Sequence, residues 1–168
     1  AVFIAVTLDG YIARRDGRLD FLDRVQREGE DYGYSSFFAA CDALVLGRKT
    51  YDTALGFPAW PYEGKRCVVL THRPAASLHG EEFTDEKPRV LLDRLGQQGV
   101  RAVYVDGGDV IRQFLAERLI DEVTLSIVPT LLGDGIPLFG PGLPELALEL
   151  VSSRSWPSGL AQLHYRRG

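Results

Sequence analysis

The residues best suited to binding chemistry stand where three short apolar runs each give way to a polar corner. The runs cover residues 43–46, 67–70 and 102–105, and each leads toward a predicted helix. The corners that follow them are Gly47-Arg48-Lys49-Thr50, Thr71-His72-Arg73 and Gly107-Gly108-Asp109-Val110. Parallel strands in an α/β sheet place such corners along one edge, where ligands usually bind. Free backbone N–H groups and basic side chains there suit an anion with several phosphates, so a dinucleotide is the first ligand to consider.

The bulk composition predicts one globular domain spanning residues 1–168. Hydrophobic residues make up 45% of the chain and charged residues 25%, and the net charge of −4 argues against general nucleic-acid binding. No stretch approaches the roughly 20 apolar residues of a membrane span, and no basic start leads into an apolar signal region. We therefore expect a cytoplasmic protein without membrane contact. Cys41 and Cys67 are predicted to be buried free thiols, and the three scattered His predict no metal site.

Hydrophobic patterning predicts the elements that position the three corners. Besides the three apolar runs, strands are predicted at residues 2–8, 122–128, 147–152 and 160–165. Helices are predicted at residues 21–25, 34–41, 49–55, 90–98 and 110–119, with Asp20 as the cap of the first. Residues 56–64 and 131–135 are predicted as loops, and residues 79–88 as an irregular segment.

This order of elements predicts a three-layer α/β/α sandwich. Its central sheet is mostly parallel, and helices cover both faces. The last three predicted strands form an antiparallel meander at the C-terminal edge of that sheet. The chain shows no internal repeat and no low-complexity linker.

Five motifs occur in one order along nearly the whole chain. They are Thr7-Leu8-Asp9-Gly10-Tyr11-Ile12-Ala13, Gly47-Arg48-Lys49-Thr50-Tyr51, Leu70-Thr71-His72-Arg73-Pro74, Val105-Asp106-Gly107-Gly108, and Asp121-Glu122-Val123 leading to Pro129-Thr130-Leu131-Leu132-Gly133. Together they resemble the dihydrofolate reductase superfamily, and within it the reductase domain of bacterial riboflavin-biosynthesis enzymes, the RibD C-terminal domain, with its stand-alone relatives. The resemblance implies a dihydrofolate reductase-like fold, an NADPH cofactor, a small-molecule substrate and a homodimer.

The first corner is similar to the superfamily's pyrophosphate site. Backbone amides at the start of its helix and the Thr50 hydroxyl would donate to phosphate oxygens. Gly47 would begin this corner, and Arg48 or Lys49 would add positive charge. The alternative is a capped helix with solvated basic side chains.

The second corner looks like the site that reads the 2′-phosphate of the adenosine ribose. The Thr71 hydroxyl and the forked Arg73 guanidinium suit a dianionic phosphate, which favours NADPH over NADH. For Arg73 the alternative is an ordinary surface charge. His72 would either stack on adenine or face water.

The third corner would let the backbone approach the cofactor closely. Gly107 and Gly108 carry no side chain, and the helix start at Asp109 and Val110 would face the phosphates. This pair is not the G-x-G-x-x-G dinucleotide fingerprint, which the chain lacks. The alternatives are a plain glycine turn and, for Asp109, a helix cap.

Three carboxylates compete to hold the substrate or to relay a proton to it. Asp20 is nearest to the acid in the first helix of dihydrofolate reductases, although Asp16 and Asp23 compete and a helix N-cap is the alternative. Asp106 stands just before the Gly-Gly pair, where riboflavin-branch reductases carry an acidic residue, usually Glu. Asp9 matches a residue near the substrate in the same branch, or is a plain turn former.

The resemblance predicts hydride transfer from NADPH to a C=N or C=O carbon of a small heterocycle or ribosylamino-pyrimidine, as in 5-amino-6-(5-phosphoribosylamino)uracil reductases. Residues 51–54 depart from that branch's pattern for the ribose phosphate. Dihydrofolate reduction and a non-catalytic NADPH-binding module are the alternatives. The chain lacks the H-x-E and P-C-x-x-C motifs of zinc deaminases. Phe57 and Trp60 are expected to wall the substrate pocket or a dimer contact.

Overall fold

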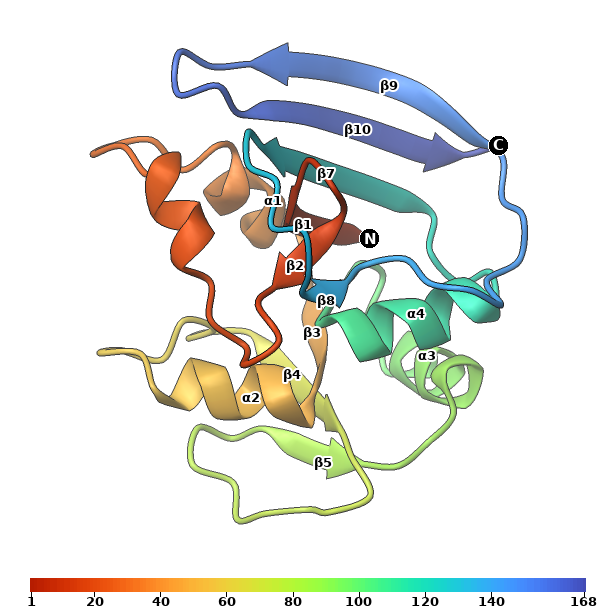
Figure 1. Ribbon diagram of the computed structural model, residues 1–168. Helices are drawn as coiled ribbons and strands as arrows, with labels where there is room; N and C mark the ends of the chain where they lie inside the picture. Colours follow the sequence, from red (N-terminus) through yellow and green to blue (C-terminus); the bar gives the residue numbers. More distant parts are fainter.

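The computed structural model describes residues 1–168 as a broad sheet accompanied by four α-helices and one 3-10 helix (Figure 1). The strands are β1 (Val2–Thr7), β2 (Tyr11–Ala13), β3 (Ala43–Gly47), β4 (Arg66–Leu70), β5 (Glu82–Thr84), β6 (Val103–Asp106), β7 (Glu122–Val128), β8 (Ile136–Pro137), β9 (Leu148–Ser155) and β10 (Ala161–Arg167). The helices are α1 (Tyr34–Ala40), α2 (Arg48–Leu55), α3 (Pro88–Gln97) and α4 (Gly108–Ala116), and the 3-10 helix covers Asp20–Arg24.

Two four-stranded sheets, ordered β5-β4-β3-β6 and β1-β7-β10-β9, meet where β1 lies beside β6. The N-terminal ammonium of Ala1 donates to the Val103 carbonyl at 2.8 Å, and the Val105 amide donates to the Ala1 carbonyl at 2.9 Å. Within each half the neighbouring strands run parallel, except that β10 is antiparallel to both β7 and β9. The predicted parallel sheet with antiparallel C-terminal strands is therefore confirmed.

Strand β3 is buried on both of its faces, which explains its unbroken apolar sequence. Val45 belongs to one core cluster, which includes residues of α3 and α4. Leu44 and Leu46, which point the other way, belong to a second cluster with residues of α1 and α2. The helices thus cover opposite faces of the sheet, and the predicted three-layer arrangement is correct.

The C-terminal strands are not a meander. The last strand in the chain, β10, lies between β7 and β9 and pairs with both. Strand β9 is exposed along its whole length, whereas most of β10 is half-buried. A strand with few buried side chains is suited to the edge of a sheet, so β9 takes the outer place although it comes earlier in the chain. Both strands also extend past their predicted ends.

Three short strands, β2, β5 and β8, were not predicted, and several helices differ from their prediction. Strand β5 lies inside the segment predicted as irregular, and β8 pairs with β2 just past the glycine-rich loop. Such strands of two or three residues carry too little pattern to be recognised. Helices α3 and α4 each begin two residues earlier than predicted, at Pro88 and at Gly108. The predicted helix over residues 21–25 is one 3-10 segment, and its cap position is Leu19 rather than Asp20.

Cys41 and Cys67 are buried free thiols, as predicted. Both belong to the core cluster shared with α1 and α2, where a thiol packs as a small apolar side chain. Burial raises the pKa of each thiol, that of Cys67 to about 12. No helix of the structure is both long and apolar enough to cross a membrane.

Candidate active site

The three predicted corners meet at the carboxyl ends of β3, β4 and β6. The strand register pairs Leu46 with Asp106 and Gly47 with Leu70, so the three strands end at the same level. Helix α2 starts directly after β3 (Figure 1), and α4 starts one residue after β6, past Gly107. The structure therefore places the starts of two helices and the loop after β4 along one edge, as the sequence predicted.

The first and third corners touch. Gly107 has a φ of 91°, and a Cβ at this position would collide with the Thr50 hydroxyl. A Cβ on Gly47 would lie 3.1 Å from a methyl group of Val110. The α2 and α4 starts can approach this closely only because neither glycine has a side chain. Lys49 and Asp109 extend the contact at the surface, with 4.0 Å between their charged atoms.

The first corner also holds the second. One guanidinium nitrogen of Arg48 donates to the Arg73 carbonyl at 2.8 Å, and Nε of Arg48 donates to Asp52 at 2.8 Å. The Arg73 amide donates to the Thr71 hydroxyl at 3.1 Å, which shapes the turn after β4. Arg48 thus braces the loop, and the exposed Arg73 side chain forms no ion pair.

Two of the predicted binding residues have surface partners. His72 lies 3.8 Å from Asp85, and both side chains are largely exposed. Asp109 accepts a hydrogen bond from Arg112 at 2.5 Å and is not the cap of α4, because that position belongs to Gly107. The alternative of Asp109 as a helix cap is therefore wrong.

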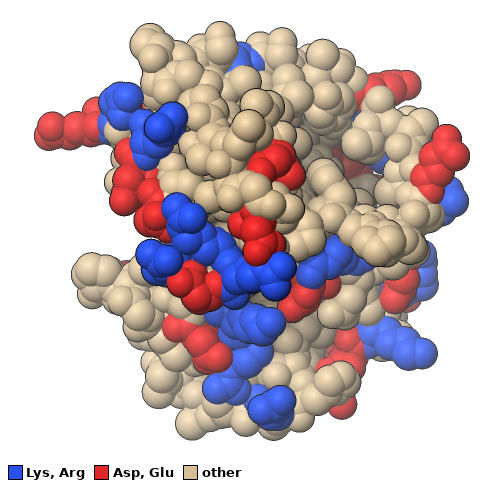
Figure 2. All heavy atoms as spheres, viewed as in Figure 1, with Lys and Arg blue, Asp and Glu red and all other residues tan.

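Charged side chains of both signs gather across the middle of the face shown in Figure 2. The segment after β2 crosses this face in Figure 1 and contributes three Arg–Asp ion pairs. These are Arg14 with Asp20, Arg15 with Asp134, and Arg18 with Asp16. Because each guanidinium is already paired, this segment adds little free positive charge to the edge. The other exposed cations there are Lys49, whose ammonium lies 4.0 Å from Asp109, and Arg73, which has no ion-pair partner.

Of the three predicted acids, Asp106 is the one whose pKa is raised by its surroundings. It ends β6, and its carboxylate accepts hydrogen bonds from the Gly107 amide at 2.8 Å and the Tyr62 hydroxyl at 3.2 Å. Tyr34 and Tyr104 lie close by, and no cation balances the charge. Burial raises the pKa of Asp106, although the hydrogen bonds from Gly107 and Tyr62 oppose the rise. This carboxyl group keeps its proton to a higher pH than an ordinary aspartate.

The other two predicted acids hold the fold. Asp9 accepts hydrogen bonds from the Thr7 hydroxyl at 2.5 Å and from the amides of Leu132 and Gly133, at 3.2 and 2.7 Å. It thereby ties the β1–β2 turn to the loop after β7. Asp20 accepts two hydrogen bonds from Arg14, at 2.6 and 2.9 Å, on the exposed surface. Those partners lower the pKa of both carboxyl groups, so each favours its charged form.

Sequence reasoning missed Tyr62 and Glu81. Tyr62 lies in the loop that was expected to wall the pocket, but only the fold brings its hydroxyl to Asp106. Glu81 is 4% exposed and accepts hydrogen bonds from the Tyr51 hydroxyl at 2.5 Å and the amides of Leu78 and His79, at 2.8 and 2.7 Å. Burial alone would raise the pKa of Glu81, but these donors lower it to about 2. A glutamate in a polar segment carries no sequence signal for such burial.

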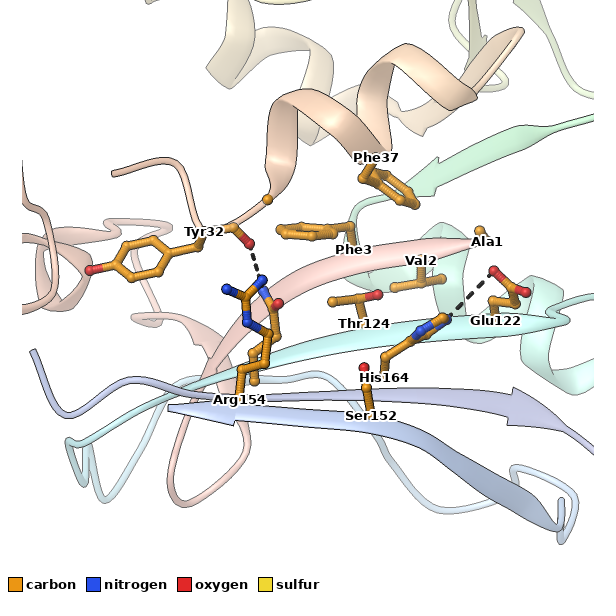
Figure 3. A pocket seen from close by; sticks show the side chains of 12 residues that line it. Ala1, Val2, Phe3, Tyr32, Phe37, Glu122, Thr124, Ser152, Arg154 and His164 are labelled. Carbon is orange, nitrogen blue, oxygen red and sulfur yellow. Dashed lines mark hydrogen bonds and ion pairs between the residues drawn. The ribbon is translucent and has the colours of Figure 1, made fainter. Parts of the chain in front are cut away.

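A separate hollow of about 270 Å³ lies where strand β1 begins (Figure 3). Phe3 and Phe37 line one side, and side chains of β7, β9 and β10 line the other. Two of its polar side chains have partners within the hollow, since Gln162 donates to the Tyr32 carbonyl at 3.1 Å and His164 lies 3.6 Å from Glu122. None of the predicted site residues lines this hollow.

The sequence model of the RibD C-terminal domain matches residues 1–161. The chain belongs to the RibD C-terminal domain family. Among its relatives, the uncharacterized protein YwjB of Bacillus subtilis (strain 168) is 38% identical over 170 residues, which are 99% of this chain and 96% of YwjB. A crystal structure from Shewanella sp. PV-4, provisionally described as a riboflavin biosynthesis protein, is 36% identical with a TM-score of 0.92, over 99% of this chain and 97% of that one.

A more distant structure shows the same fold. The deaminase and 5-amino-6-(5-phosphoribosylamino)uracil reductase of Thermotoga maritima matches with a TM-score of 0.76 at 15% identity. The match covers 99% of this chain and 56% of the bifunctional protein. The predicted membership of the RibD C-terminal family and its dihydrofolate reductase-like sandwich are thus confirmed, and a reductase-like role is supported.

Gly107→Ala should destabilise this RibD C-terminal domain by about 1–3 kcal/mol, because the new Cβ would collide with Thr50 at a positive φ. Gly142→Ala is the matched control, since Gly142 has a φ of 86° and nothing lies within 4 Å of its Cβ position. Urea unfolding measures both free energies. Equal losses would contradict the crowding, and adding Thr50→Ala to Gly107→Ala should recover part of the stability.

The stability of the domain should fall in acid through Glu81. Its pKa is about 2 in the folded protein against an ordinary 4.5, so the carboxylate stabilises the fold above pH 4.5. That contribution disappears as the pH falls from 4.5 toward 2. In urea unfolding over this range, Glu81→Gln should decline less steeply than the wild type, whereas the exposed control Glu63→Gln should follow the wild type. Identical slopes for Glu81→Gln and wild type would refute this role.

Proposed function

We propose that this RibD C-terminal domain is an NADPH-dependent reductase that transfers hydride to a C=N or C=O carbon of a small heterocycle or ribosylamino-pyrimidine. The observation that carries the proposal is the meeting of the three corners at one sheet edge. There Gly107, which has no side chain, lets the Thr50 hydroxyl of the first corner pack directly against the third corner. Two helix starts brought together in this way, with exposed cations beside them, suit the phosphates of a dinucleotide.

Each corner has a distinct part in holding the cofactor. The amides at the starts of α2 and α4, with the Thr50 hydroxyl, would donate to the pyrophosphate. The exposed Arg73 guanidinium and the Thr71 hydroxyl would bind the 2′-phosphate that distinguishes NADPH from NADH. Arg48 contributes indirectly, because its guanidinium already holds the Arg73 carbonyl and Asp52. When bound, NADPH supplies the hydride.

Asp106 and Tyr62 would serve the substrate. Reduction of a C=N or C=O bond adds a hydride to carbon and a proton to nitrogen or oxygen. Asp106, whose pKa is raised by burial, is the group at this edge suited to hold that proton for the substrate. Tyr62 donates to the same carboxylate and would fix its orientation.

The support for a pyrimidine-type substrate comes from the family. The Thermotoga maritima relative carries the name of an aminouracil reductase, and the Shewanella relative, at 36% identity, is linked to riboflavin biosynthesis. Residues 51–54, which depart from the riboflavin-branch pattern, serve the fold here. Tyr51 is buried against Glu81, and Asp52 pairs with Arg48. A ribose phosphate would therefore need other partners on this chain.

Titration with NADPH and NADH tests the cofactor assignment. Thermal shift should show strong stabilisation by NADPH and weak stabilisation by NADH. Arg73→Ala should weaken NADPH binding about ten- to hundredfold, since it removes a charge-assisted hydrogen bond. Arg101→Ala, an exposed change before β6 and away from the corners, is the control. No stabilisation by either nucleotide would overturn the reductase proposal.

Asp106→Asn separates stability from activity. The raised folded pKa means that the stability contributed by Asp106 is present below pH 3.8 and is lost as the pH rises through the folded value. As the pH rises above 3.8, the free energy of unfolding should therefore fall less in Asp106→Asn than in the wild type. The NADPH oxidation rate with aminouracils, pterins or dihydrofolate should fall about 10²–10⁴-fold.

The exposed Asp93→Asn serves as the control for Asp106→Asn and should change neither stability nor rate. Full activity in Asp106→Asn would remove Asp106 from the mechanism. Turnover of dihydrofolate in preference to aminouracils would favour the dihydrofolate reductase alternative. NADPH binding without turnover of any of these substrates would favour a binding module.

A further inference from the structure

The loop between β4 and β5, residues 71–81, is hydrogen-bonded near both of its ends to helix α2. Near its start, Arg48 of α2 donates to the Arg73 carbonyl at 2.8 Å. At its end, Tyr51 of α2 donates to the Glu81 carboxylate at 2.5 Å. Arg48 and Tyr51 are three residues apart and so lie on the same side of α2. One helical turn therefore fixes both ends of the loop that carries the second corner.

Glu81 organises the far end of this loop from the inside. Its carboxylate accepts the amides of Leu78 and His79 and, at 3.3 Å, the Ser77 hydroxyl. With the Tyr51 hydroxyl, this makes four donors to one side chain that is 4% exposed. A buried carboxylate so fully satisfied holds its neighbouring backbone in one conformation.

Aromatic packing closes the far end of the loop. The His79 ring stacks on Trp60, with 4.5 Å between ring centroids and 6° between ring planes. Tyr51 meets Trp60 and Phe83 edge-on, at 5.9 and 5.3 Å. Tyr51 itself is 1% exposed. The hydroxyl of Tyr51 is therefore held in place by packing and aimed at Glu81.

We infer that Tyr51 and Glu81 are positioning residues that set cofactor preference by holding the 71–81 loop in its 2′-phosphate-binding shape. The inference rests on the proposed function, in which Thr71 and Arg73 meet that phosphate. A loop held in its binding conformation loses less entropy when the ligand arrives, and so binds more tightly. We call the contacts of Arg48 with Arg73 and of Tyr51 with Glu81 the clamp. Because α2 also starts at the pyrophosphate corner, the clamp fixes the distance between the proposed pyrophosphate site and the proposed 2′-phosphate site.

The clamp should act on NADPH and spare NADH. Both nucleotides share the pyrophosphate, but only NADPH places a phosphate on the 71–81 loop. Loosening the loop should therefore weaken NADPH binding and leave NADH binding nearly unchanged. A merely structural role would lower stability without changing the ratio of the two dissociation constants.

Tyr51→Phe removes one hydroxyl and keeps the packed ring, so it is the first variant to measure. Fluorescence titration of the full chain should show the NADPH dissociation constant rising about three- to tenfold, with NADH unchanged. Tyr32→Phe is the matched control, because Tyr32 also donates from a partly buried hydroxyl, to the Val25 carbonyl, outside the loop. It should leave the ratio of the two constants as in the wild type. A second variant, Glu81→Asp, keeps the charge but withdraws the carboxylate from its four donors, so it should weaken NADPH binding at least as much as Tyr51→Phe and also leave NADH unchanged.

Hydrogen exchange supplies a readout that needs no cofactor. The amides of Leu78 and His79 should exchange faster in Tyr51→Phe than in the wild type, and Tyr32→Phe should leave them protected. A wild type that prefers NADPH and a Tyr51→Phe variant with the same preference would overturn this inference and leave the proposed function standing. A wild type with no preference for NADPH would overturn the proposed function and the cofactor role of the clamp. Unchanged exchange of both amides in Tyr51→Phe would overturn the clamp itself.

Discussion

The contact between Thr50 and Gly107 is the constraint on which the candidate site depends. Strands β3 and β6 pair in parallel and end at the same level, so the helices that follow them must start side by side. The start of α2 and the start of α4 lie so close together that a Cβ on Gly107 would collide with the Thr50 hydroxyl. Glycine at 107 meets both demands, since it adopts a φ of 91° and brings no Cβ.

Two carboxylates show how burial can lead to opposite results. Glu81 is surrounded by four donors, and its pKa falls to about 2, so it stays charged and holds a loop. Asp106 lies among tyrosine rings with fewer donors and no cation, and its pKa rises. Environments that push the pKa values of two acids apart often separate structural from chemical roles. The proposed function uses the raised pKa of Asp106, and Glu81 keeps the charge that holds its loop.

The two halves of the sheet have different tasks. The half formed by β5, β4, β3 and β6 carries the three corners, and its strands are buried between two layers of helices. The half formed by β1, β7, β10 and β9 carries the separate hollow and ends in the exposed strand β9. Asp9 links the β1–β2 turn to the loop after β7. The chemistry of the proposed function therefore lies in the half of the sheet that is packed on both sides.

The parallel strands, their corners and the family could be predicted from the sequence, because these features are local. An unbroken apolar run such as residues 43–46 predicts a strand buried on both faces, and a glycine pair before a helix predicts a close backbone approach. Pattern did not predict the order of β9 and β10 or the three shortest strands. These depend on how much of each strand the finished core can bury.

The three predicted acids differ in what surrounds them in the folded protein. Asp9, Asp20 and Asp106 all stand beside turns or strand ends, so their sequence positions did not rank them. Their pKa values depend on partners far away in the chain, such as Tyr62 for Asp106 and Gly133 for Asp9. Glu81 resembles any polar loop residue until the fold buries it against Tyr51. Local pattern determines which elements form, whereas the chemistry of a side chain depends on neighbours that only folding brings together.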